Sequence, residues 1–248
     1  MIGDVISLVL LTLLGSVAGL AGGVALLVNK RLSKILELNA IPFAVGVLMT
    51  VALVGIMPEA VEILGKSAYG IMALAFGVVF VFERVFFAVH HHEGGHEGLH
   101  KSSAVLVIVG DTIHNFIDGV AIGASFLIAP GLGLVTAVST FLHEIPHEVG
   151  DFGILLKAGW NKTNIILVNL FSALATMVGA LAVYWVLNSQ GLIGAMLAIS
   201  GGIFLYLGAI DFLPQVARGS GSRWEKLVPL MLGAGLMLAV ILAVPHAD

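Results

Sequence analysis

The sequence predicts an all-α membrane protein that crosses the bilayer several times. Hydrophobic residues make up 59% of its 248 residues, charged residues only 10%, and the mean hydropathy is +1.08. Soluble domains average about 25% charged residues, so this composition excludes an ordinary soluble domain. The 31 glycines are typical of transmembrane helices that approach one another closely. The absence of cysteine excludes disulfides and thiolate metal sites.

Eight apolar segments are long enough to cross a membrane, since a spanning helix needs about 20 residues. We place them at 4–28, 40–64, 69–90, 103–129, 132–158, 162–187, 192–215 and 226–245. Short polar connections separate them, among them KRLSK at 30–34 and a histidine-rich loop at about 90–101. No stretch resembles a soluble domain, so we expect residues 1–248 to form a single transmembrane domain.

The lysines and arginines predict how the chain is oriented. Of these 11 residues, only Lys66 falls on the side of the even-to-odd connections. Because positive residues concentrate in cytoplasmic loops, we expect both termini outside and the histidine-rich loop in the cytoplasm. The first apolar run lacks a basic leader and a cleavage site, so we expect a true span. The compact size and the lack of a targeting peptide favour a prokaryotic plasma (inner) membrane.

Two proline motifs indicate an internal symmetry. GIMPEA (Gly55–Ala60) lies late in the second predicted span, and DFLPQV (Asp211–Val216) lies late in the seventh. These spans run in opposite directions, as they would in an inverted repeat of helices one to three and six to eight. The fourth and fifth helices would then form a central pair.

That central pair carries an unusual number of polar side chains. The fourth span contains Asp111, His114, Asn115 and Asp118, whose spacing places them on one helix face. The fifth span contains a second set at helical spacing: His143, Glu144, His147, Glu148 and Asp151. The two sets fall near the middle of consecutive antiparallel helices joined by a tight turn. We therefore expect them to face each other near the bilayer midplane.

A divalent cation explains these sets better than interhelical hydrogen bonds do. A charge at the bilayer centre costs about 3 kcal/mol or more, and several carboxylates lie at one depth. A bound cation takes neutral imidazole nitrogens and ionised carboxylate oxygens, so the charges cancel locally. Pro146 should kink the fifth helix, and freed backbone is tolerated in a membrane where it lines a polar site. The sequence thus predicts a metal site on a transport pathway.

Two other functions fit parts of this pattern. His143–His147 reads HExxH, which in zinc proteases supplies two zinc ligands and a general base. Against an intramembrane metalloprotease, Pro146 distorts that turn, and the second polar set has no needed place in a one-metal hydrolase. The other alternative is a proton-coupled cation exchanger that uses the same carboxylates as a relay.

HNFIDGVAIG (His114–Gly123) and HEIPHEVGD (His143–Asp151) together closely resemble the fourth and fifth helices of the ZIP (Zrt/Irt-like) metal transporters. The eight predicted spans and GGIFLYLGAIDFLPQ (Gly201–Gln215) are also similar to that family. The resemblance implies a transporter, not an enzyme, that imports a divalent metal ion into the cytoplasm. Zinc would be the main substrate, with iron, manganese or cadmium as further ones. The expected partners are divalent metal ions, the lipid bilayer and a second copy in a homodimer, with no nucleic acid.

The resemblance also implies ligands. A first metal site would take His114, Asp118, His143 and His147. A second site would take Asn115 and Glu144, with Asp118 as a bridge. Acids on the cytoplasmic side would form an exit: Glu148, Asp151, Asp111 and Asp211.

The sequence departs from the family pattern in helices two, six and seven. Helix six has Asn169 and Ser172 but no carboxylate, where some relatives place one. Helix two has Met57 before its proline, as a soft ligand or a core methionine, where relatives often place an acid and a histidine. Gln215 follows the proline of helix seven, where glutamate is common. These departures leave the metal selectivity and the second metal open. The histidine-rich loop could capture arriving metal or be a solvated loop without a function.

Overall fold

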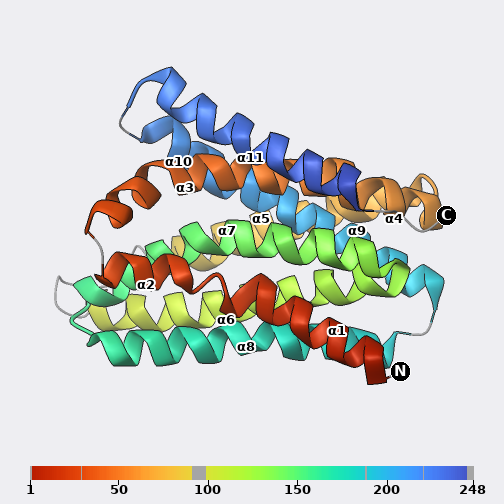
Figure 1. Ribbon diagram of the computed structural model, residues 1–248, viewed down its shortest axis with the longest axis horizontal. Coiled ribbons are helices and arrows are strands. Elements are labelled where there is room, and N and C mark those ends of the chain that lie inside the picture. Colours follow the sequence, from red (N-terminus) through yellow and green to blue (C-terminus); the bar gives the residue numbers. More distant parts are fainter. Residues whose placement is uncertain (1, 29, 91–98, 188, 220, 245–248) are drawn as a thin grey trace.

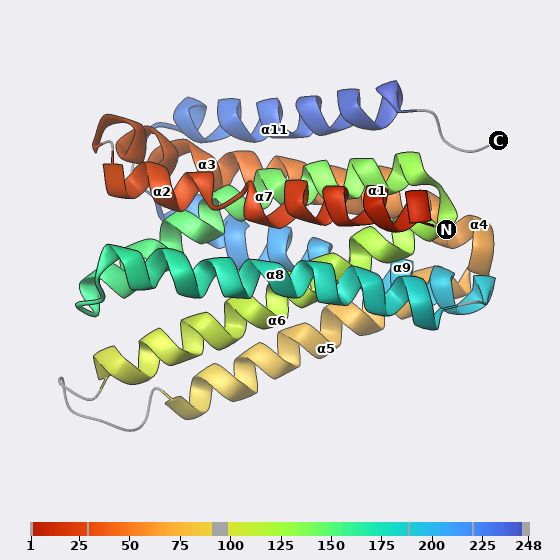
Figure 2. The same cartoon turned by 60° about the horizontal axis from the view of Figure 1, so that its bottom comes forward.

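The computed structural model describes residues 2–28, 30–90, 99–187, 189–219 and 221–244, with side chains except at 26, 30–34, 37, 85–90, 99–104 and 106. Helices make up almost all of these residues and none of them lies in a strand, which confirms the predicted all-α class (Figure 1). The start of α1 and the end of α11 lie at the same end of the bundle in both views (Figures 1 and 2).

Most predicted spans are single helices, and three are composite. The single ones are α5 (Ser67–His90), α6 (Leu99–Ile128), α7 (Pro130–Lys157), α8 (Lys162–Val186) and α11 (Arg223–Ala243). The composite ones contain a π-helical segment: α1 (Ile2–Thr12), η1 (Leu13–Val17) and α2 (Ala21–Val28); α3 (Lys30–Thr50), η2 (Val51–Ile56) and α4 (Met57–Leu64); α9 (Gln190–Tyr206), η3 (Leu207–Phe212) and α10 (Leu213–Arg218).

Six helical runs in the described part of the chain are long and apolar enough to cross a membrane. They are Ile2–Ala25, Leu38–Leu64, Ser67–Arg84, Lys162–Val186, Gln190–Arg218 and Arg223–Ala243. The helices α6 and α7 are long enough, with 30 and 28 residues, but they carry the charged side chains of the central pair. Eight crossings therefore remain a prediction, of which six are supported by length and composition.

The polar segment at 30–34 lies between the candidate spans Ile2–Ala25 and Leu38–Leu64, as expected of a connection, and it forms the first turns of the helix α3. Lysine, arginine and leucine are good helix formers, so a basic segment can leave the membrane without ending the helix. Hydropathy marks the membrane boundary here, and it does not mark the helix end.

The prolines of the two symmetric motifs follow π-helical segments. Pro58 lies directly after η2 at the start of α4, and Pro214 lies directly after η3 at the start of α10. A first-turn proline needs no backbone donor, and a π-helical turn absorbs the irregularity that it causes. The segment η2 packs on α9, and η3 packs on α3, so each broken span contacts the other. The inverted repeat itself remains a prediction.

The helices pack as two groups. In the first, α6 packs against α7 and α8, and η1 and α2 cover α7. In the second, α3 packs against α11, and α9 packs against α4 and α5. The groups meet where α3 contacts α7 and where α6 contacts α9. Figure 1 shows α6 between α7 and α8, so the predicted central pair is adjacent.

Candidate metal site

Two neighbouring groups of metal-binding side chains lie where α6 meets α7. The first group, called the imidazole group below, is His114, Asp118, His143 and Glu144. The second, called the carboxylate group, is Asp111, Glu144 and Glu148. Within each group, one ligand atom from every residue lies within 4.8 Å of the others. Ligand atoms around a tetrahedral zinc ion with bonds of about 2 Å lie about 3.3 Å apart, so small side-chain movements would adjust either group to an ion.

Helical spacing accounts for both groups. On α6, residues 111, 114 and 118 are three and four positions apart, so they share one face. On α7, residues 144 and 148 are four apart, and 143 lies beside them. Pro130 starts α7 immediately after α6 ends at Ile128, so the two helices are antiparallel neighbours. The structure brings the two polar sets together, as the sequence predicts.

The imidazole group is tightly packed. His114 Nε2 lies 3.0 Å from Glu144 Oε1 and 3.6 Å from Asp118 Oδ2. His143 Nε2 lies 3.0 Å from the same Asp118 oxygen. Asp118, His143 and Glu144 are buried, and His114 is nearly so. Two imidazoles and two carboxylates are a donor set that suits zinc.

A backbone contact sets the tautomer of His143. Its Nδ1 lies 2.9 Å from the carbonyl oxygen of Ser139, so in the neutral ring Nδ1 carries the proton and donates it. The Nε2 lone pair then points towards Asp118 Oδ2, which is also an acceptor. A cation between Nε2 and Oδ2 relieves this repulsion. Metal-bound histidines usually hold their second nitrogen in this way.

The carboxylate group consists of buried acids with unsatisfied oxygens. Oε2 of Glu144, both oxygens of Glu148, and Oδ2 of Asp111 are buried without a hydrogen-bond donor in the described part of the chain, whereas Glu144 Oε1 has His114 Nε2 beside it. An unsatisfied buried polar atom costs about 1 to 3 kcal/mol, and a charged one costs more. A divalent cation among these oxygens would offset that cost. Carboxylate oxygens alone bind many divalent ions.

Asn115 is hydrogen-bonded to Asp111, a member of the carboxylate group. Its Nδ2 donates to Asp111 Oδ1 at 2.9 Å. Its Oδ1 accepts from Thr176 Oγ1 at 2.9 Å and lies 2.7 Å from Ser16 Oγ. The amide oxygen is thus held by η1 and α8, and the amide nitrogen by Asp111 on α6. Ser16 and Thr176 are not predicted from the sequence, because a lone hydroxyl in an apolar span carries no distinctive signal.

His147 is adjacent to the imidazole group without belonging to it. Its ring centroid lies 4.5 Å from that of His114 and 4.7 Å from that of Phe212. Its Nε2 is buried and has no hydrogen-bond partner among the described residues. Because His147 is outside the imidazole group, its side chain would have to move to bring this nitrogen to the same cation.

The remaining acids of the predicted exit lie apart from both groups. Asp151 is half-buried on α7, one turn beyond Glu148. Asp211 lies in η3, where its Oδ1 accepts from Gln215 Nε2 at 3.1 Å. Gln215, which stands where glutamate is common in similar sequences, therefore hydrogen-bonds to Asp211, one of the acids of the predicted exit.

Two further expectations concern Met57 and the histidine-rich loop. Met57 packs against the large hydrophobic core cluster, as expected for a core methionine. The loop at 90–101 lies largely outside the described residues, so its role remains a prediction.

Helix one closes one side of the site through a glycine. A methyl group on Gly19 would lie 2.6 Å from Glu144 Cβ and 3.0 Å from the carbonyl oxygen of Ser16. Only glycine therefore lets this turn approach the residue that both ligand groups share. The close approach keeps Glu144 against its partners on α6.

Comparison with known sequences supports a family assignment. The profile of the family described as ZIP zinc transporter matches residues 90–241, more than half of the chain and the whole of the α6–α7 pair. The chain belongs to the ZIP family. This ZIP protein is therefore an integral membrane protein, in agreement with its apolar helices.

Several curated relatives are similar to the chain over part of their length. Zinc transporter ZIP10 of Mus musculus is 39% identical over 153 residues, which are 56% of this chain and 18% of the relative. Zinc transporter foi of Drosophila melanogaster is 34% identical over 170 residues, 62% of this chain and 24% of the relative. Zinc transporter zipt-7.1 of Caenorhabditis briggsae is 35% identical over 157 residues, which are 57% of this chain and 40% of the relative. The matched part thus makes up between about a fifth and two fifths of these relatives.

Proposed function

We propose that this ZIP protein carries a divalent cation, zinc first, across the membrane through the site between α6 and α7. The observation that carries the proposal is that Glu144 belongs to both ligand groups. An ion held by the imidazole group can pass to the carboxylate group without leaving Glu144. The names of the relatives support zinc as the substrate. Iron, manganese and cadmium are further candidates.

The order of the ligands supports a direction of movement. Going from Asp118 to Asp111 on α6 leads the same way as going from His143 to Glu148 on α7, because the helices are antiparallel. Along this direction the donors change from mixed nitrogen and oxygen to oxygen only, and Asp151 follows. Binding must weaken towards the exit, since a transported ion has to leave. The exit is on the side predicted to be cytoplasmic.

The two groups of helices supply a physical basis for alternating access. The ligands of both groups lie on α6 and α7, within the first group of helices. The second group, around α3 and α9, contacts α6 and α7 along one side. Movement of one group against the other would expose the site to each side of the membrane in turn.

Glu144 distinguishes a transporter from an HExxH protease. In such a protease this glutamate activates water and leaves the metal to the histidines. Here Glu144 Oε1 lies 3.0 Å from His114 Nε2, inside the imidazole group. The position suits a ligand. The family and its zinc transporter relatives also support transport without covalent chemistry.

The location of the protein is part of the proposal. We expect both termini outside, a prokaryotic plasma membrane, a single domain over residues 1–248, and a homodimer. The start of α1 and the end of α11 lie at one end of the bundle, which agrees with an even number of crossings.

Proteoliposomes loaded with a fluorescent zinc indicator test the proposal. We expect zinc influx with the wild-type protein and no cleavage of added peptides. Absence of influx from correctly folded protein, with peptide cleavage lost in Glu144→Gln, would establish the protease instead. Influx that strictly requires an opposing pH gradient would favour the exchanger.

A further inference from the structure

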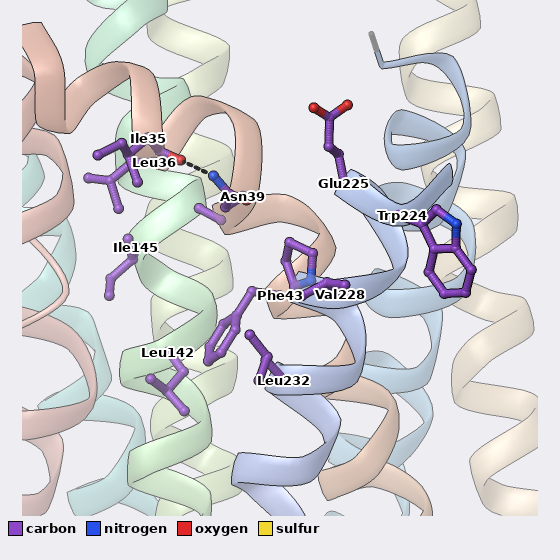
Figure 3. A pocket seen from close by; sticks show the side chains of 12 residues that line it. Ile35, Leu36, Asn39, Phe43, Leu142, Ile145, Trp224, Glu225, Val228 and Leu232 are labelled. Carbon is purple, nitrogen blue, oxygen red and sulfur yellow. Dashed lines mark hydrogen bonds between the residues drawn. The ribbon is translucent and has the colours of Figure 1, made fainter. Parts of the chain in front are cut away.

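A wedge-shaped groove opens on the surface between α3, α7 and α11, away from the metal site. It encloses about 740 Å³. Phe43 and Leu232 lie near each other at one end of the groove, and Ile35 and Glu225 lie at the other (Figure 3). Leu142 and Ile145 of α7 form its third side (Figure 3).

The packing of α3 on α11 explains the wedge. A methyl group on Gly46 would collide with the backbone of Leu230 and Ala234, and one on Gly233 would collide with the backbone of Phe43. The two helices therefore touch at their glycines. Both begin at the same end of the bundle, and their earlier turns separate from this contact (Figure 1). The gap widens towards the starts of α3 and α11.

The lining of the groove is almost entirely hydrocarbon. Ten of its twelve residues are apolar: Ile35, Leu36, Ala40, Phe43, Leu142, Ile145, Trp224, Val228, Pro229 and Leu232. The polar exceptions are Asn39, whose Nδ2 donates to the carbonyl of Ile35, and Glu225, whose Oε2 accepts from the backbone of Ser222. Both are engaged by their own helices. The interior of the groove therefore matches an acyl chain.

The wide end of the groove is rich in basic residues. Arg218, Arg223 and Lys226 lie at the end of α10 and the start of α11. Within residues 213–226 the acid is Glu225, so basic residues outnumber acids three to one and the positive charge dominates. Trp224, which is exposed, is the residue type found at membrane interfaces.

We propose that the groove binds one anionic phospholipid, with an acyl chain in the wedge and the headgroup on the basic residues at its wide end. Charge complementarity selects an anionic headgroup, because basic pockets between membrane helices on the cytoplasmic side favour such lipids. The groove lies on the side that the lysines and arginines predict to be cytoplasmic. Its third side, Leu142 and Ile145, flanks the metal ligands His143 and Glu144 on α7. The bound lipid therefore contacts both groups of helices.

Native mass spectrometry of the purified protein tests this, using phosphatidylglycerol and phosphatidylcholine of the same chain length. We expect tighter binding of phosphatidylglycerol. Arg223→Gln should weaken it about fivefold, as removal of one basic residue near the headgroup implies. Lys66→Gln is the matched control, since Lys66 is exposed in the turn at the opposite end of the bundle, and it should leave binding unchanged.

A second pair of variants tests the acyl chain site without changing charge. Val228→Trp fills the groove and should abolish selective binding of phosphatidylglycerol. Met231→Trp, on α11 but outside the lining, should bind as the wild type does. Equal binding of the two lipids, or unchanged binding to Val228→Trp, would overturn the proposal. So would a dimer that Val228→Trp dissociates, because a second copy of the chain would then cover the groove. The measurement needs no metal, so it stands apart from the transport test.

Discussion

The imidazole group and the carboxylate group lie side by side between α6 and α7, share Glu144, and differ in the atoms that they offer. The first has two imidazole nitrogens, whereas the second has only carboxylate oxygens. Nitrogen donors favour zinc and related transition metals. A site made of oxygen donors alone also suits manganese, magnesium or calcium. We infer that selection among metals takes place at the imidazole group and that the carboxylate group mainly lets the ion pass.

Removing a ligand of the imidazole group should have the largest effect. Asp118→Ala and His143→Ala should each lower zinc influx more than about 100-fold, because even partners of ligands contribute 10- to 100-fold to metal affinity. Both variants should keep their helical content and their detergent-solubilised size. Near-normal influx in both, measured in proteoliposomes, would place the site elsewhere.

Changing the donor atom tests the difference between the groups more sharply. His143→Asp makes the imidazole group richer in oxygen, so the ratio of zinc to manganese influx should fall by about 10- to 100-fold. Glu148→Gln should slow both metals and leave their ratio unchanged. A large change of the ratio in Glu148→Gln would show that selection occurs at the carboxylate group.

Gly19→Ala should affect both groups through their shared ligand. The added methyl group would lie 2.6 Å from Glu144 Cβ, so Gly19 or Glu144 would have to shift. Overpacking of this kind costs about 1 to 3 kcal/mol, so we expect influx of both metals to fall about tenfold. Gly150→Ala is the control, since Gly150 lies on α7 with open space around it. Equal activity of the two variants would contradict a close contact at Glu144.

The smallest effect is expected from the hydroxyl groups that hold Asn115. Thr176→Val keeps the shape of the side chain but removes the donor to Asn115 Oδ1. Loss of one such hydrogen bond should weaken metal binding at the carboxylate group about threefold. Thr176→Ser retains the hydroxyl and should restore binding, whereas a packing defect would affect Thr176→Ser as much as Thr176→Val.

The two groups also show how far the sequence predicts this site. Helical spacing and the tight turn before Pro130 were enough to bring His114 and Asp118 opposite His143 and Glu144. They did not predict the hydrogen bonds that Asn115 makes with Asp111, Ser16 and Thr176. Those to Ser16 and Thr176 depend on η1 and α8, which are distant in sequence. Local spacing contains no information about such contacts.

The fold shows the same limit. Hydropathy located the apolar runs well, because burial in lipid requires them. It did not show that the polar connection at 30–34 is helical and forms the first turns of α3. It also did not predict the π-helical segments η2 and η3, which lie before Pro58 and Pro214. Both features depend on backbone hydrogen bonds, and hydropathy does not record these.

The most direct test is the amount of zinc bound at equilibrium to purified wild-type protein, His143→Ala and Glu144→Gln, by elemental analysis after dialysis against zinc. Because both groups use Glu144, we expect the wild type to bind zinc, His143→Ala to bind less, and folded Glu144→Gln to bind essentially none. If Glu144→Gln bound as much zinc as the wild type, the two groups would not share this ligand, and the proposed path of the ion through Glu144 would be wrong.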